Sequence, residues 1–269
     1  MKRSFLARLQ TNAIAYCIGA LLLLLVVPGF QLLVLTPLGY GNALHAAGPG
    51  GHFASYLTWI NLHAFYFILY RVLLAVSFAL LLSLPFSLFR IIVAQELLEA
   101  QDEESEEDDE QAGDGLPSDA WKGKGFAIIA AWAGLFGIII YIVGTLASTL
   151  YFTLVSKGMT PALALPAGFV ALSAFFTITS NTVGIGLLAL STLLFGAMIA
   201  RRGTRLWPGI WVAFSYLAIA VTALFSGSAV AIASAPTEGQ AALTSPAILL
   251  FAVWVLWLGI MLIRLKPEE

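Results

Sequence analysis

One arginine lies inside a long apolar segment, and it is the residue of this sequence best suited to bind a ligand. Arg71 follows the aromatic run Tyr66–Tyr70, about eight residues into an apolar stretch at 63–93. Lenient insertion scales put the cost of an arginine at the centre of a membrane helix at about 2.5 to 3.5 kcal/mol. Such a residue needs a partner, and its guanidinium suits an anionic group such as a phosphate or a carboxylate.

Polar residues also interrupt the fourth apolar segment, at 177–182. At 1.5 Å per residue, this cluster and Arg71 lie at similar depths from the same face of the membrane. Helical spacing places His63 and Tyr70 on the same face of the second segment as Arg71. We therefore predict that the two groups face each other and form a ligand-binding site. Its members are Arg71, Tyr70, His63, Thr177, Ser180 and Asn181.

Three interpretations of Arg71 stay open at this point. In the first, uncharged polar groups, water or a bound anion neutralise Arg71, because no Asp or Glu falls within the apolar segments. A second interpretation has the side chain reach along its own helix to the headgroups. In the third, the polar residues form part of a translocation path, for which further ionisable residues would be expected deeper in the bundle.

Other site chemistries have little support in the sequence. The three histidines, His45, His52 and His63, are loosely spaced, and the residues around them include no Cys, Asp or Glu that would complete a metal site. The single cysteine, Cys17, is interpreted as a small core residue. The sequence has no Gly-x-Ser-x-Gly turn and no carboxylate within a span to orient a histidine. We therefore predict no catalytic residue, no metal and no cofactor, and an enzyme is the least favoured class.

Six long apolar segments must position these residues. The chain of 269 residues is 60% hydrophobic and 10% charged, against about 25% charged residues in soluble proteins. Each segment is long enough to cross a bilayer as a helix. A β-barrel would show short alternating segments, whereas Leu21–Val27 and Ile138–Val143 are continuously apolar. The prediction is an all-α, polytopic transmembrane bundle forming a single domain over 1–269, with spans at about 12–36, 63–93, 125–155, 164–200, 208–233 and 246–264.

The basic residues predict how the bundle is oriented. All thirteen Lys and Arg residues except Arg71 and Lys157 lie at the two termini or in the second and fourth connections. Basic residues are retained on the cytoplasmic side of a membrane. We therefore expect both termini in the cytoplasm, an even number of spans, and a multi-pass protein of the plasma (inner) membrane.

Two connections have distinctive compositions. Twelve of the fifteen acidic residues lie at 96–119, which predicts a flexible acidic cytoplasmic linker. That linker either keeps the surface soluble or docks a basic partner or divalent cations. The connection at 36–58 is rich in Gly and Pro, which predicts an irregular cap on the outer face.

Small residues on the third and fourth segments would let these two helices approach closely. They are Ala133, Gly137, Gly184 and Gly186.

The C-terminal part of the chain resembles a known group of proteins. The residues concerned are 184–199, Arg201 and Arg202, the run Leu206–Trp211, and the final-segment residues Val253, Trp254, Leu258, Gly259 and Ile260. In this stretch, about a third of the chain, the sequence looks like uncharacterised six-span bacterial membrane proteins of unknown function. The resemblance implies a six-span fold and brings no active site with it.

These observations favour an integral membrane protein without an evident catalytic site. The leading hypothesis is an accessory subunit or a lipid- or anion-binding module, and the alternative is a transporter or channel subunit for a small solute. The expected partners are membrane lipids and a larger membrane complex, and no nucleic acid is expected. The absence of an acidic residue from the spans argues against proton-coupled pumping.

Overall fold

The structure is a computed structural model that describes residues 3–49, 52–93, 124–206 and 209–264. These residues form helices and connecting turns, with no strand among them. Six helical stretches are long and apolar enough to cross a membrane: Leu9–Leu35, Ala64–Val93, Gly125–Ser156, Phe169–Arg201, Gly209–Ser234 and Glu238–Arg264. The predicted all-α bundle of six spans is therefore confirmed. The predicted acidic linker at 96–119 lies outside the described residues.

Several spans consist of more than one helical segment. The first comprises α1 (Arg3–Leu21), η1 (Leu22–Val26), α2 (Val27–Phe30) and η2 (Gln31–Leu35), where η marks a π-helix. The second comprises α5 (Ala64–Ala79), a turn, and helical residues 84–93. The third is α7 (Lys124–Ser156), and the fourth comprises α8 (Phe169–Thr177), η4 (Ile178–Gly184) and α9 (Ile185–Leu206). The fifth is α10 (Gly209–Ser234), and the sixth comprises α11 (Glu238–Ala241) and α12 (Thr244–Arg264).

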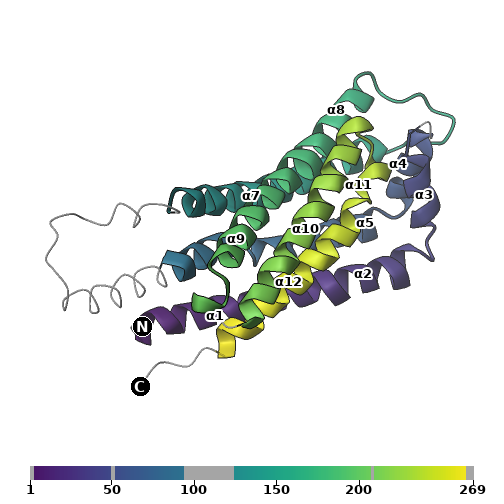
Figure 1. Cartoon of the computed structure of the whole chain (residues 1–269). Coiled ribbons are helices and arrows are strands. Elements are labelled where there is room, and N and C mark those ends of the chain that lie inside the picture. Colours follow the sequence, from purple (N-terminus) through teal and green to yellow (C-terminus); the bar gives the residue numbers. More distant parts are fainter. Residues whose placement is uncertain (1–2, 50–51, 94–123, 207–208, 265–269) are drawn as a thin grey trace, which may run out of the picture.

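The helices run lengthwise through one bundle (Figure 1). We call the end where α1 begins and α12 finishes the terminal end. The opposite end, which we call the cap end, carries α11 together with two short helices, α3 (Tyr40–Ala46) and α4 (Phe53–Leu62). The main packed pairs are α9 with α10, α7 with α9, α1 with α12, α10 with α12, and α5 with α7.

The cap end differs from the sequence-based expectation. The connection at 36–58 was expected to be irregular, but α3 lies within it and α4 begins within it. Pro37, Gly39, Gly48 and Pro49 lie in the turns beside α3, whereas Tyr40, Tyr56 and Trp59 are buried. Burial of large aromatic side chains stabilises these short helices, which their propensity alone would not do.

Two span boundaries also differ from the prediction. The fourth span begins at Phe169 rather than near 164, after Gly168 in a left-handed conformation (φ 76°) that ends the preceding turn. The sixth begins at Glu238 rather than at 246. Helix α12 itself begins at Thr244, because the proline at 246 is tolerated within the first turn of a helix.

Buried apolar side chains form two clusters. The larger, the bundle core, runs along the spans and includes Phe78, Phe251 and Trp254. The smaller, the cap core, joins α3 and α4 to the cap-end parts of α7 and α8, and includes Tyr40, Tyr56 and Phe169. Tyr70 packs against both clusters. The residues around Tyr70 therefore lie where the two cores meet.

Close backbone contact holds the third and fourth spans together. A Cβ atom on Gly137 would lie 2.8 Å from Gly184 O and 2.9 Å from Leu188 N. The predicted close approach of these two helices is confirmed at Gly137 and Gly184, whereas Gly186 faces open space. Glycine is needed at 137 because no side chain fits between the two backbones.

Candidate functional site

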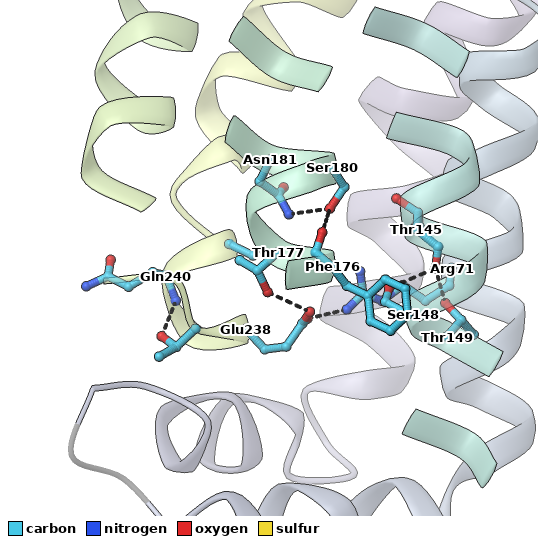
Figure 2. Close-up of polar contacts among 12 residues, drawn as sticks. Arg71, Thr145, Ser148, Thr149, Phe176, Thr177, Ser180, Asn181, Glu238 and Gln240 are labelled. Atoms are coloured by element: carbon cyan, nitrogen blue, oxygen red, sulfur yellow. Dashed lines mark hydrogen bonds and ion pairs between the residues drawn. The ribbon is translucent and has the colours of Figure 1, made fainter. Parts of the chain in front are cut away.

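Arg71 forms a buried ion pair with Glu238. Its Nη2 donates a hydrogen bond to Glu238 Oε2 at 2.5 Å, and the two side chains are 12% and 3% exposed. Figure 2 shows the Glu238 carboxylate directed from α11 toward the arginine. The expectation that Arg71 has no acidic partner is therefore wrong, and so is the interpretation in which it reaches to the headgroups. The error arose because Glu238 was assigned to a connection outside the sixth span.

Helix α11 places Glu238 against the bundle. Thr237 caps the helix, and its side chain accepts a hydrogen bond from Gln240 N at 3.4 Å. Gly239 N donates to Ala47 O at 3.2 Å, and a Cβ on Gly239 would lie 2.7 Å from Gly48 Cα. The two backbones are in direct contact, so the position of Glu238 depends on glycine at 239.

The ion pair has few other polar contacts. Thr177 Oγ1 donates to Glu238 Oε1 at 3.3 Å, and Arg71 Cζ lies 5.3 Å from the centre of the Phe67 ring. Arg71 Nε and the Tyr56 hydroxyl are buried without a hydrogen-bond partner in good geometry. An unsatisfied buried donor is uncommon in proteins and calls for an explanation. The guanidinium retains donors for a further group.

A second polar cluster lies in the π-helical part of the fourth span. Asn181 Nδ2 donates to Ser180 Oγ at 3.0 Å, and Ser180 Oγ donates to Phe176 O at 2.8 Å (Figure 2). Thr244 Oγ1 on α12 lies within hydrogen-bonding distance of Asn181 Oδ1, at 3.4 Å. A π-helix is wider than an α-helix and occurs frequently at functional sites. Here η4 joins the fourth span to the sixth.

A cavity of about 130 Å³ lies beside the ion pair, where the bundle core meets the cap core. One part of its wall is polar and another is apolar. The polar lining residues are Gln31, Tyr40, Tyr70, Arg71, Tyr141, Asn181, Glu238, Thr244 and Ser245. The apolar residues are Leu23, Val27, Pro28, Leu44, Leu74, Ala241, Ala242, Ile248 and Leu249.

Each of the three π-helical segments in the described part of the chain contributes a residue to the cavity wall. These are Leu23 from η1, Gln31 from η2 and Asn181 from η4. Segments η1 and η2 flank Pro28, whose ring and missing amide hydrogen disturb a regular α-helix. The irregular turns thus occur where side chains are required at the cavity.

The cavity opens between the first and sixth spans. Helix α12 packs closely against α1 and η1, but this close packing does not extend to α2 and η2. Figure 1 shows the two spans diverging toward α3 and α11. On the α12 side, the lining residues Ala242, Ser245 and Leu249 are exposed. The exposed part of the cavity wall thus lies near the cap ends of the first and sixth spans.

Aromatic rings close the cavity toward the terminal end. Tyr141, which lines the cavity, lies 4.6 Å from Phe78 between ring centres, and Phe78 stacks on Phe251 at 6.2 Å. Beyond this aromatic layer is a second cavity of about 10 Å³, whose wall includes Phe251 and Trp254. The cavity beside the ion pair therefore ends at the aromatic layer.

Burial keeps two cap-end tyrosines in the neutral form. Burial raises the pKa of Tyr40 well above its usual value, and nearby tyrosines add to the effect. Burial and the Glu238 carboxylate also raise the pKa of Tyr56, while Arg71 acts in the opposite direction. Neither phenol is a proton donor or acceptor suited to neutral pH.

The structure brings together five of the six predicted site residues. Arg71, Tyr70 and Asn181 line the cavity, and Tyr70 donates to Gln31 Oε1 at 3.1 Å. Thr177 and Ser180 lie behind the lining and hold Glu238 and Asn181. His63 does not share the site. It lies between α4 and α5, stacks on Trp59 at 5.0 Å, and its Nδ1 is 3.1 Å from Trp59 O.

Sequence reasoning missed several lining residues. Glu238 carried a usable signal, because it is the one acidic residue between Asp119 and Glu268 and it adjoins a long apolar segment. A lone arginine in a span and a lone glutamate at the edge of another favour a charge pair. Gln31 and Tyr40 gave no comparable signal, since their positions depend on how the cap folds.

The described residues contain no group of three or more His, Cys, Asp or Glu side chains that could hold a metal ion.

Comparisons of the chain with protein-family models, with curated proteins and with solved structures found no match.

Proposed function

We propose that this integral membrane protein binds the polar head of a membrane amphiphile in the cavity beside Arg71 and Glu238. The observation that carries the proposal is a buried ion pair on the wall of a cavity that opens between two spans. Buried ion pairs add little to stability, because desolvating two charges costs about as much as their attraction returns. Ionisable residues inside membrane proteins usually serve binding or transport. The pair is therefore better explained by a ligand than by folding.

The size of the cavity limits what it can hold. A cavity of roughly 150 Å³ is large enough for benzene, and sites for drug-sized ligands occupy about 300 to 1,000 Å³. About 130 Å³ suits a head group and not a whole lipid. The acyl chains of the ligand would remain outside, between the diverging first and sixth spans.

The position of the opening fits the same ligand. Pro28 and Leu249 are apolar lining residues on opposite sides of the opening, whereas Arg71 and Glu238 lie deeper. An amphiphile that enters from the bilayer would meet the apolar edge with its chains and the polar wall with its head. We further propose that the cap end faces outward across a plasma (inner) membrane, because basic residues cluster in the chain segments belonging to the terminal end.

Native mass spectrometry of the protein released from its own membrane without delipidation tests this function. The wild type is expected to carry a lipid. Ser245→Phe, at the exposed edge of the cavity, is expected to lose it. The matched control is Val253→Phe, on the same helix at an exposed position away from the cavity, and it should retain the lipid. A wild type that carries no lipid, or equal retention by both variants, would refute the proposal.

A transporter or channel subunit is the second candidate, and one observation favours it. Two cavities lie along the same spans, and the layer of Tyr141, Phe78 and Phe251 separates them. If that layer is a barrier on a translocation path, Phe78→Ala should increase the flux of small solutes into vesicles that contain the protein. Unchanged flux would remove the support for this candidate.

The sequence also suggested an accessory subunit of a larger complex. If the protein is such a subunit, a second protein should co-purify with it in mild detergent. The Ser245→Phe variant should keep that second protein even though it loses the bound lipid.

A further inference from the structure

We propose that the head group bound in this cavity carries both a cationic and an anionic group, as an ammonium joined to a phosphate does. This inference rests on the proposed function and specifies the class of its ligand. It is carried by the charges on the cavity wall, where Arg71 and Glu238 are the two ionisable residues of opposite sign and form one pair.

A ligand with a single negative charge is poorly suited to this wall. Glu238 lies in hydrogen-bonding contact with Arg71, so an anion near the guanidinium also lies near the carboxylate. The attraction of the anion to Arg71 and its repulsion from Glu238 then largely cancel, so they do not offset the cost of desolvating the anion. For a ligand with a single positive charge, attraction to Glu238 and repulsion from Arg71 cancel in the same way. Like-charge contact of this kind is how a binding site excludes the wrong ligand.

The anionic group of the ligand has donors available at Arg71. Among the described residues, the guanidinium makes one hydrogen bond in good geometry, from Nη2 to Glu238 Oε2, and the Tyr56 hydroxyl also lies close to it. Some of its five N–H groups therefore remain for a ligand. Ser245 lies on the same wall and adds a hydroxyl. A phosphate can accept several such bonds at once, and arginine is the side chain best matched to it.

The cationic group has acceptors and aromatic rings available. Glu238 Oε1 accepts one long hydrogen bond of 3.3 Å from Thr177, which leaves room for another donor. Tyr40 and Tyr70 both line the cavity, with their ring centres 6.0 Å apart. A carboxylate beside aromatic faces is a favourable setting for an ammonium group. Because the two protein charges are in contact, the two charges of the ligand should be joined by a short spacer.

Nanodiscs of defined composition provide the test. The full-length protein is placed in nanodiscs that contain equal amounts of phosphatidylethanolamine, phosphatidylglycerol and diacylglycerol with the same acyl chains. Native mass spectrometry then measures which lipid remains bound after release. The wild type is expected to retain phosphatidylethanolamine over phosphatidylglycerol by at least about tenfold, since like-charge contacts cost several kcal/mol and 1.4 kcal/mol is tenfold.

Charge variants sharpen the test. Glu238→Gln leaves Arg71 uncompensated and should reverse the preference toward phosphatidylglycerol. The double variant Arg71→Gln/Glu238→Gln removes both charges without leaving one unpaired, and it should bind the three lipids without preference. The double variant also keeps the test valid if a single substitution prevents folding, because it retains a neutral pair of similar shape.

The outcomes separate this inference from the proposed function. If the wild type prefers phosphatidylglycerol or diacylglycerol, the cavity binds a lipid but the inference about charge is wrong. If no lipid is retained, the proposed function itself is wrong. In a separate experiment, soluble O-phosphoethanolamine is added to nanodiscs in which the protein has retained phosphatidylethanolamine. Displacement of bound lipid by millimolar amounts would show that the head group alone is recognised, and the absence of displacement would show that the acyl chains are needed.

Discussion

The terminal half of the bundle and the region around the cavity are both built from apolar helices, but they are packed in different ways. In the terminal half, helices meet through close backbone contacts. A Cβ on Gly259 of α12, for example, would lie 3.2 Å from the backbone oxygen of Ala13 on α1. Around the cavity, the spans contain π-helical segments and polar side chains, and the first and sixth spans diverge. The same fold thus combines a close-packed half with a half that leaves space for a ligand.

This difference shows which residues are needed for folding and which are better explained by binding. Van der Waals contact is the main force between helices in lipid, so the glycine contacts of the terminal half stabilise the bundle directly. The ion pair of the cap half costs desolvation energy and leaves Arg71 Nε unsatisfied. Substitutions in the two halves should therefore separate stability from ligand retention.

The largest expected effect is from breaking the ion pair. Arg71→Gln leaves Glu238 buried without a counter-charge, and removal of one partner of a buried pair costs about 3 to 5 kcal/mol. The free energy of unfolding in detergent measures this loss. The double variant Arg71→Gln/Glu238→Gln should regain most of it, and Arg201→Gln, at an exposed position, serves as the control. A double variant as unstable as the single one would show that the pair does stabilise the fold.

The next effect concerns the close contact between Gly137 of the third span and the end of η4. Gly137→Ala forces a methyl group against the backbone at Gly184 and Leu188, which should cost about 1 to 3 kcal/mol of stability. Lipid retention by the folded fraction should be unchanged, because Gly137 is not part of the cavity wall. Gly186→Ala is the matched control, since its methyl group meets open space and should be neutral or slightly stabilising. Loss of lipid in folded Gly137→Ala would mean that the two halves are coupled.

Gly239→Ala should reduce lipid retention strongly and stability only slightly, the reverse of Gly137→Ala. The added methyl group pushes α11 away from Gly48 and displaces Glu238, so lipid retention should fall strongly. The stability cost should be only about 1 kcal/mol, because a four-residue helix at the end of the bundle can move. Gly41→Ala on α3 meets no atom within 4 Å and is the control. Normal retention in Gly239→Ala would show that the position of α11 does not govern binding.

The smallest effect at neutral pH is expected for Tyr56→Phe. Its hydroxyl lies close to Arg71 but makes no hydrogen bond in good geometry, so the loss of this weak contact and the removal of a poorly satisfied buried group should nearly cancel at pH 7, to within about 1 kcal/mol.

The effect of Tyr56 should emerge at alkaline pH. In the folded protein the pKa of Tyr56 is raised, whereas in the unfolded chain it is about 10. Above pH 10 the unfolded chain therefore loses a proton that the folded protein keeps, and stability falls by up to about 1.4 kcal/mol per pH unit. Unfolding measured between pH 9 and 11 should show a shallower fall for Tyr56→Phe than for the wild type. Equal slopes would mean that the phenol ionises in the folded protein.

Part of the fold could be predicted from the sequence because the controlling interactions are local. Each long apolar run satisfies its backbone hydrogen bonds as a helix, so hydropathy and length were enough to predict six spans. Gly137 and Gly184 indicated the close approach of the third and fourth spans, because a missing side chain permits it whatever the rest of the fold. Arg71 could be singled out as a candidate residue because an arginine inside a long apolar segment is unusual whatever its neighbours.

The remaining features depend on contacts between distant parts of the chain, and only the tertiary structure decided them. Glu238 lies 167 residues from Arg71, and its role depends on the contact of Gly239 with Gly48. The cap helices form because Tyr40, Tyr56 and Trp59 are buried against the spans, although their segment is rich in Gly and Pro. The cavity exists because α12 leaves the first span beyond η1. Composition and periodicity determine which segments enter the membrane, whereas the packing of those segments determines which charges meet there.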